Sequence, residues 1–217
     1  FRDVISSDNK PYGLHRARVE SFFIGEKIVA LRKCAGRPVF AYANGLNYMS
    51  ATFYVIKTNR VNMKYLTGLL NSKLIEFWLK NKGKMQGANY QLDKEPLQQI
   101  PIAVPSNDVQ EIVAKLVDMI ILLNTTDERA SELVQNSYIS SELEKLIDGC
   151  IYEIYLPSEM AGMSVITVLR NYIKQKDSIS IDGIWELYMK IDSTGIIESL
   201  NSLSLSSSET LRTIILS

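Results

Sequence analysis

The pattern of apolar residues changes at Pro105, and this change constrains the fold more than any other feature of the chain. Before Pro105, apolar residues gather in short stretches that are rich in β-branched and aromatic side chains and are separated by turn-forming residues. After Pro105, they recur at intervals of three and four, which is the spacing of one helix face. The sequence therefore predicts an α+β fold, with a mixed α/β domain at residues 1–105 and an all-α helical domain at residues 106–217.

The first domain is expected to hold short strands and one long helix. The helix is predicted from Met63 to Lys80, because its apolar residues share one face, Asn62 can serve as the N-cap, and Gly83 follows its end. A polar segment, Lys82 to Glu95, follows the helix and is assigned no strand. The predicted strands are Arg18 to Ile24, Lys27 to Arg32, Val39 to Ala43, Ala51 to Lys57 and Gln99 to Val104.

The second domain is expected to be helical throughout. Its first helix is predicted from an Asn107 cap to Leu123, with Gln110 in the position of a capping box. The next helix contains Leu143 to Tyr155 and ends before Pro157. The same spacing predicts further helices from a Ser158 cap to Lys176, from Ile181 to Ile191, from Thr194 to Leu203 and from Ser207 to Leu216.

A formal net charge of zero conceals two oppositely charged regions. Residues 1–105 contain 16 Lys and Arg against 7 Asp and Glu, whereas residues 106–217 contain 8 against 17, so the regions carry +9 and −9. A concentrated positive field attracts polyanions such as nucleic acid or an acidic protein. No apolar run approaches the roughly 18 residues that span a bilayer, so no membrane partner is expected.

The residue types that catalysis and metal binding require are scarce. His15 is the only histidine, which excludes a Cys/His zinc pattern and leaves any serine or cysteine nucleophile without a well-placed base. Cys34 and Cys150 lie far apart in the sequence, which fits reduced thiols of a cytoplasmic protein better than a disulfide framework. We therefore expect no catalytic residue, no metal site and no cofactor within this chain.

A series of short motifs resembles a DNA target recognition domain. The likeness is to the TaqI-like C-terminal specificity domain of adenine-specific DNA methyltransferases, including type IIG restriction-modification enzymes, and it covers roughly residues 18 to 160. The motifs that carry it, in chain order, are Lys27-Ile28-Val29 with Arg32, Thr52 to Ile56, Tyr65-Leu66 with Leu69 to Ser72, Leu97 to Ile102, Leu143-Glu144 with Ile147-Asp148, and Tyr152 to Leu156.

The resemblance implies a division of labour within a bacterial restriction-modification enzyme. A separate upstream domain or partner subunit would bind S-adenosylmethionine and methylate adenine, and a nuclease could be fused to it. The present chain would be non-catalytic and would read the sequence of double-stranded DNA. This expectation agrees with the positive charge of residues 1–105.

Two segments of the basic region combine cations for phosphates with amide side chains for base edges. The first contains the candidate DNA-binding residues Arg32, Lys33, Arg37, Tyr42, Asn44, Asn47 and Tyr48. The second contains Lys80, Lys82, Lys84, Gln86, Asn89, Tyr90 and Gln91, with two glycines that allow close approach of the backbone.

Structural explanations compete with several of these assignments. Asn44-Gly45 is also a hairpin turn signal, Tyr42 and Tyr48 can be ordinary sheet residues, and the lysines can complement a helix end. Two other functions stay open: half of a type I restriction specificity subunit, and a protein-interaction module formed by the acidic helices. The acidic face could dock on a catalytic domain, on a partner subunit or on the back of the basic region.

Overall fold

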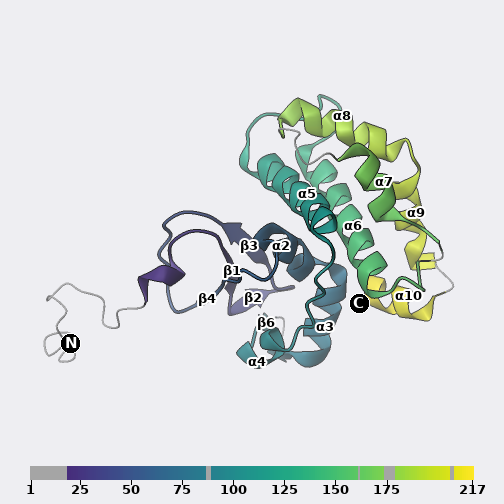
Figure 1. The fold of residues 1–217 in the computed structure, drawn as a ribbon. Coiled ribbons are helices and arrows are strands. Elements are labelled where there is room, and N and C mark those ends of the chain that lie inside the picture. Colours follow the sequence, from purple (N-terminus) through teal and green to yellow (C-terminus); the bar gives the residue numbers. More distant parts are fainter. Residues whose placement is uncertain (1–18, 87–88, 161, 174–178, 206–207) are drawn as a thin grey trace, which may run out of the picture.

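The computed structural model describes residues 19–86, 89–160, 162–173, 179–205 and 208–217. It confirms an α+β fold, with small antiparallel sheets in the N-terminal region followed by helices (Figure 1). Within these residues, none of the helices has the length and apolar character needed to cross a bilayer.

The first sheet has the strand order β3-β1-β4, and all its pairings are antiparallel. Its strands are β1 (Lys27–Leu31), β3 (Phe40–Ala43) and β4 (Phe53–Ile56), which confirms three of the predicted strands. The prediction of a strand at 18–24 is wrong over its described part, because Glu20–Phe22 form a 3-10 helix, η1. The central strand β1 buries Ile28 and Ala30, so the sheet is held by apolar contacts as well as by its hydrogen bonds.

A second sheet, with the order β2-β6-β5, was not predicted. It consists of β2 (Lys33–Ala35), β5 (Lys84–Gln86) and β6 (Asn89–Gln91), so the polar segment after the helix contributes two of the strands. Arg32 joins the two sheets through its backbone. Its N–H donates to Thr52 O at 2.9 Å, and its carbonyl accepts from Leu92 N at 2.9 Å.

The long helix predicted from Met63 is divided into α2 (Met63–Asn71) and α3 (Lys73–Lys82). Ser72 ends one helix and caps the next, since its Oγ donates to Leu69 O at 2.7 Å and accepts from Ile75 N at 3.4 Å. The prediction for the start of the helix is confirmed, because Asn62 Oδ1 accepts from the backbone N–H groups of Lys64 and Tyr65.

The strand predicted at 99–104 is wrong. A short helix, α4 (Lys94–Gln98), is followed by a stretch that joins neither sheet. Tyrosine hydroxyls take the place of a strand partner: Tyr65 Oη donates to Ala103 O at 2.9 Å, and Tyr155 Oη donates to Pro101 O at 2.6 Å. Two backbone carbonyls of this stretch are therefore satisfied by side chains of two helices.

The C-terminal region is helical as predicted, although several helices begin at residues other than those expected. The first helix follows Ser106, so Asn107 is not its cap, and Gln110 instead accepts a hydrogen bond from Asn62 N at 2.8 Å. Ser158 does not cap the third helix, which follows Ser164. The elements are α5 (Asn107–Thr125), α6 (Asn136–Tyr155), α7 (Val165–Tyr172), α8 (Ile181–Asp192), α9 (Ile196–Asn201), η2 (Ser202–Leu205) and α10 (Glu209–Leu216).

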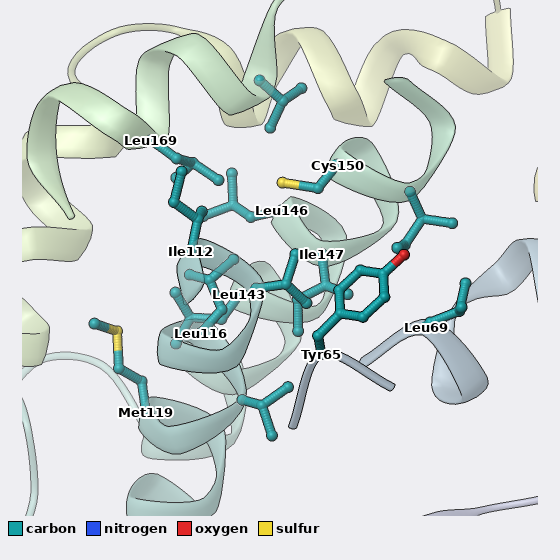
Figure 2. Close-up of a cluster of buried hydrophobic side chains, with 14 of the residues drawn as sticks. Tyr65, Leu69, Ile112, Leu116, Met119, Leu143, Leu146, Ile147, Cys150 and Leu169 are labelled. Carbon is teal, nitrogen blue, oxygen red and sulfur yellow. The ribbon is translucent and has the colours of Figure 1, made fainter. Parts of the chain in front are cut away.

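The hydrophobic core continues across Pro105. Tyr65 and Leu69 of α2 lie beside residues of α5 and α6 in one cluster (Figure 2). Gly68 allows this close approach, because a Cβ at that position would lie 2.8 Å from Val113 Cγ1 and 3.4 Å from Ile147 Cγ2. Pro105 thus marks a change of charge and secondary structure, while the two regions share one core; the division into two domains there stays a prediction.

Candidate nucleic-acid interface

The two polar segments meet in the second sheet, β2-β6-β5, which we call the recognition sheet. The backbone register places Lys33 of β2 and Lys84 of β5 on either side of Gln91. Two residues further along the strands, Asn89 stands between Ala35 and Gln86. Residues separated by more than fifty positions in the sequence are therefore neighbours, and the sheet lies at the opposite end of the molecule from α8 (Figure 1).

The inner face of the recognition sheet is anchored by Tyr90. This side chain is 1 % exposed, and its hydroxyl donates to Leu79 O at the end of α3. Burial raises the pKa of Tyr90 to about 12. Although Tyr90 was a candidate DNA-binding residue, the structure gives its side chain a place in the core, where it fixes the sheet to α3.

The outer face carries the polar residues, because alternate residues of a strand point to opposite faces. Lys33 and Asn89 are exposed, and the Asn89 side chain makes no hydrogen bond to the described residues. Gln91 is half-buried, and its Nε2 donates to Asp93 Oδ1 at 2.7 Å. The backbone of Lys84 and Gln86 is described as part of β5, but their side chains lie outside the described part of the chain.

Two further cations are exposed close to these strands in the chain. Arg32 precedes β2 and lies over the ring of Tyr54, 5.3 Å from its centroid. Lys82, at the end of α3, lies 5.7 Å from the Trp78 ring. Lys80 is different, since its Nζ is held by Glu76 at 3.0 Å and by the C-terminal Ser217 O at 2.6 Å.

Three other candidates of the first segment, Asn44, Asn47 and Tyr48, lie near the opposite end of β1, in a loop that we call the tip (residues 44–48). Lys27, at the start of β1, donates from Nζ to Gly45 O at 2.7 Å, which places Asn44 beside this end of the strand. Tyr48 contacts Phe23 and donates to Glu20 Oε1 at 3.1 Å. Asn47, Asn44 and Tyr48 are exposed, but the structure does not join them to the recognition sheet.

Lys27 is a fully buried residue that the sequence pattern does not mark as part of the site. Its ammonium also donates to Gly25 O at 2.8 Å, and thus joins the tip to the residues that precede β1. Burial, followed by repulsion from Lys57, lowers the pKa of Lys27. Strand alternation gives no signal for this burial, because it places Lys27 on the opposite face from the buried Ile28 and Ala30.

Arg37 and Tyr42 face other parts of the protein. Arg37 Nη1 donates to Asn71 O at 3.3 Å, and Nη2 lies 3.7 Å from Glu144 Oε2 of α6. The Tyr42 hydroxyl donates to Glu26, and burial together with this hydrogen bond raises the tyrosine pKa. Both side chains are therefore engaged away from the recognition sheet.

The sequence of this region matches a known family. Residues 5–102 match the family of TaqI-like C-terminal specificity domains. The match includes both sheets and the tip, whereas residues 143–156, which also resembled these enzymes, lie outside it. No curated protein matches the chain. The family match supports a DNA-recognition specificity module of a methyltransferase-type enzyme. Within the described residues, no cluster of His, Cys, Asp or Glu could hold a metal ion.

Proposed function

We propose that this chain is the sequence-reading module of a restriction-modification DNA methyltransferase that modifies the N6 atom of adenine. The family match supports the coarser function of DNA recognition. The observation that carries the proposal furthest is the pairing of the two polar segments into one sheet, with Lys33 and Asn89 exposed on it. S-adenosylmethionine and the catalytic residues would belong to a separate domain, as in the type IIG arrangement.

The recognition sheet has suitable chemistry for the major groove, which admits a β-ribbon. The amide of Asn89 can donate to and accept from an adenine edge, while Lys33 and Lys82 can bind phosphates. Gln91 can join them if it releases Asp93. Such a grip would hold the duplex while the catalytic domain rotates its target adenine out of the stack.

The acidic helices favour approach of DNA from one side. Asp118 of α5 binds Lys64 at 2.6 Å, and Glu144 of α6 lies near Arg37, so part of the negative charge docks on the back of the basic region. Helices α8 and α9, which contain Asp182, Glu186, Asp192 and Glu198, lie on the far side of α5 and α6 from the strands (Figure 1). Phosphates would be repelled from that end of the molecule.

Binding to duplex DNA tests the proposal. DNA sequences that bind the unchanged whole chain would first be selected. The affinities of Asn89→Ala and Lys33→Ala for these and other sequences would then be measured by fluorescence anisotropy at several salt concentrations. We expect Asn89→Ala to lose roughly 1–3 kcal/mol on the selected sequence and little on others. Lys33→Ala should weaken all sequences and lower the salt slope by about one.

Matched substitutions control for general effects. Asn59 and Lys190 are exposed and lie outside the recognition sheet, so Asn59→Ala and Lys190→Ala should bind DNA as the unchanged chain does. Binding that is unaffected by both Asn89→Ala and Lys33→Ala would show that another surface reads the DNA.

A further inference from the structure

A hollow of about 540 Å³ lies where the specificity domain meets the helices. Strand β3 and helix α2 form one side, and helices α5 and α6 form the other. Its walls are mostly apolar, with Phe40, Val117, Ile120, Ile121 and Ile147 among them. This volume and lining are typical of sites for small organic molecules.

Asp148 of α6 lines this hollow and accepts only one hydrogen bond from the described residues. Its Oδ1 accepts a hydrogen bond from the backbone N–H of Lys73 at 2.8 Å. Among the described residues, no hydrogen bond reaches Oδ2. Burial raises the pKa of this carboxyl group to about 7, so the nearby positive charges do not offset its desolvation.

Charged groups of both signs line the hollow, namely the carboxylates of Asp148 and Glu144 and the basic groups of Arg37, Lys73 and Lys145. Glu144 also lines the wall and lies 3.7 Å from Arg37 Nη2. Two lysines line it as well, but Lys73 Nζ is held by Glu76 at 3.0 Å, and Lys145 Nζ is held by Glu142 at 2.8 Å. Neither of those partner carboxylates lines the hollow. Both lysine ammonium groups are thus paired with carboxylates outside the hollow, and among the described residues neither forms an ion pair with Asp148.

We propose that this hollow binds a small aliphatic amine, with its ammonium group on Asp148 and its hydrocarbon chain along Ile120 and Ile121. The ammonium supplies the positive charge and the donors that Asp148 lacks, and a hydrogen bond between charged groups is stronger than one between neutral groups. The apolar walls remove the hydrocarbon from water. This site is separate from the recognition sheet and does not depend on the proposed reading of DNA.

Thermal unfolding of the whole chain with n-hexylammonium, n-butylammonium, hexan-1-ol and hexanoate at pH 8 and constant ionic strength tests the site. Hexylammonium should raise the melting temperature in a saturable way and bind roughly tenfold more tightly than butylammonium, because each buried methylene contributes about fourfold in affinity. Hexanol and hexanoate should give much smaller shifts. Equal stabilisation by hexanol, stronger binding of hexanoate, or no shift with hexylammonium would overturn the proposal.

Substitutions test whether the amine binds in the hollow. Asp148→Asn keeps an acceptor for Lys73 N and should weaken hexylammonium at least tenfold, while Asp127→Asn, on an exposed residue outside the hollow, should not. Ile121→Trp should block binding while Asp148 stays in place, with circular dichroism showing that the variant folds. Unchanged affinity in Asp148→Asn would refute the assignment.

The pH dependence gives a second readout. Hexylammonium stays protonated between pH 5.5 and pH 8, whereas Asp148 becomes protonated toward the lower value. Affinity should therefore fall about tenfold on acidification in the unchanged chain and stay nearly constant in Asp148→Asn. Glu144, Arg37, Lys73 and Lys145 are the other charged groups at the hollow, and both proteins share them. Equal pH dependence in both proteins would contradict the role of Asp148.

Discussion

At the scale of single residues, Gly83 and Tyr90 show how closely the recognition sheet is fitted to α3. A Cβ on Gly83 would overlap Tyr90 Oη and lie 2.6 Å from Leu79 O. We expect Gly83→Ala to cost about 2–3 kcal/mol of unfolding free energy, because it displaces a buried hydroxyl from its acceptor. Urea unfolding measures this cost. It should be smaller when Gly83→Ala is made in a Tyr90→Phe background, and equal costs in both backgrounds would show that the two residues are not coupled.

The candidate DNA-binding residues show how much of the site the sequence could reveal. Lys33 and Asn89 could be chosen as candidates because cations and amides have recognisable uses at DNA. Tyr90 was chosen by the same logic but is buried, since a strand of three residues is too short to show which of its positions face inward. Arg37 has partners on Asn71 and α6 that depend on tertiary packing, which spacing in the sequence does not encode.

At the scale of elements, the strands that were predicted correctly are those whose own residues favour strands. β1, β3 and β4 contain β-branched and aromatic residues between turn signals. The recognition sheet was missed because its strands are short, mostly polar and paired across a long sequence separation. Residues 99–104 have strand character, but the hydroxyls of Tyr65 and Tyr155 occupy their backbone groups.

Helix α2 depends on its cap in a way that can be measured. Asn62 Oδ1 accepts from Lys64 N at 2.8 Å and from Tyr65 N at 3.2 Å, which satisfies two backbone donors at the helix start. Asn62→Ala should therefore lower the unfolding free energy by about 1–2 kcal/mol in chemical denaturation. Asn59→Ala, in the preceding loop, should have little effect. If the two substitutions cost the same, the cap contributes nothing beyond the general effect of removing an amide.

At the scale of the whole molecule, Asp148 at the junction between the two regions should make the free energy of unfolding depend on pH. The folded-state pKa of Asp148 is about 7, against roughly 4 in an unfolded chain, so the folded state holds a proton over this interval that the unfolded state has lost. The contribution of Asp148 is present below pH 4 and is lost as the pH rises toward 7. Asp148→Asn keeps the acceptor for Lys73 N without titrating, so its advantage over the unchanged chain should grow by about 3–4 kcal/mol between pH 4 and pH 8. Urea unfolding at several pH values measures this difference, and parallel profiles would contradict the assignment.

The shared core makes a stronger prediction about the whole molecule. Residues 1–105 contain the family match and both sheets, yet Tyr65, Leu66 and Leu69 of α2 belong to a core that includes many residues of α5 and α6. A fragment that ends at Pro105 would expose these side chains to water, and fully burying each one contributes about 1.5–3 kcal/mol. That loss is comparable to the net stability of a small domain, so the fragment should not unfold cooperatively. Circular dichroism and denaturant titration of residues 1–105 beside the whole chain measure this. A sigmoidal transition in the fragment would show instead that the matched domain folds without its helices.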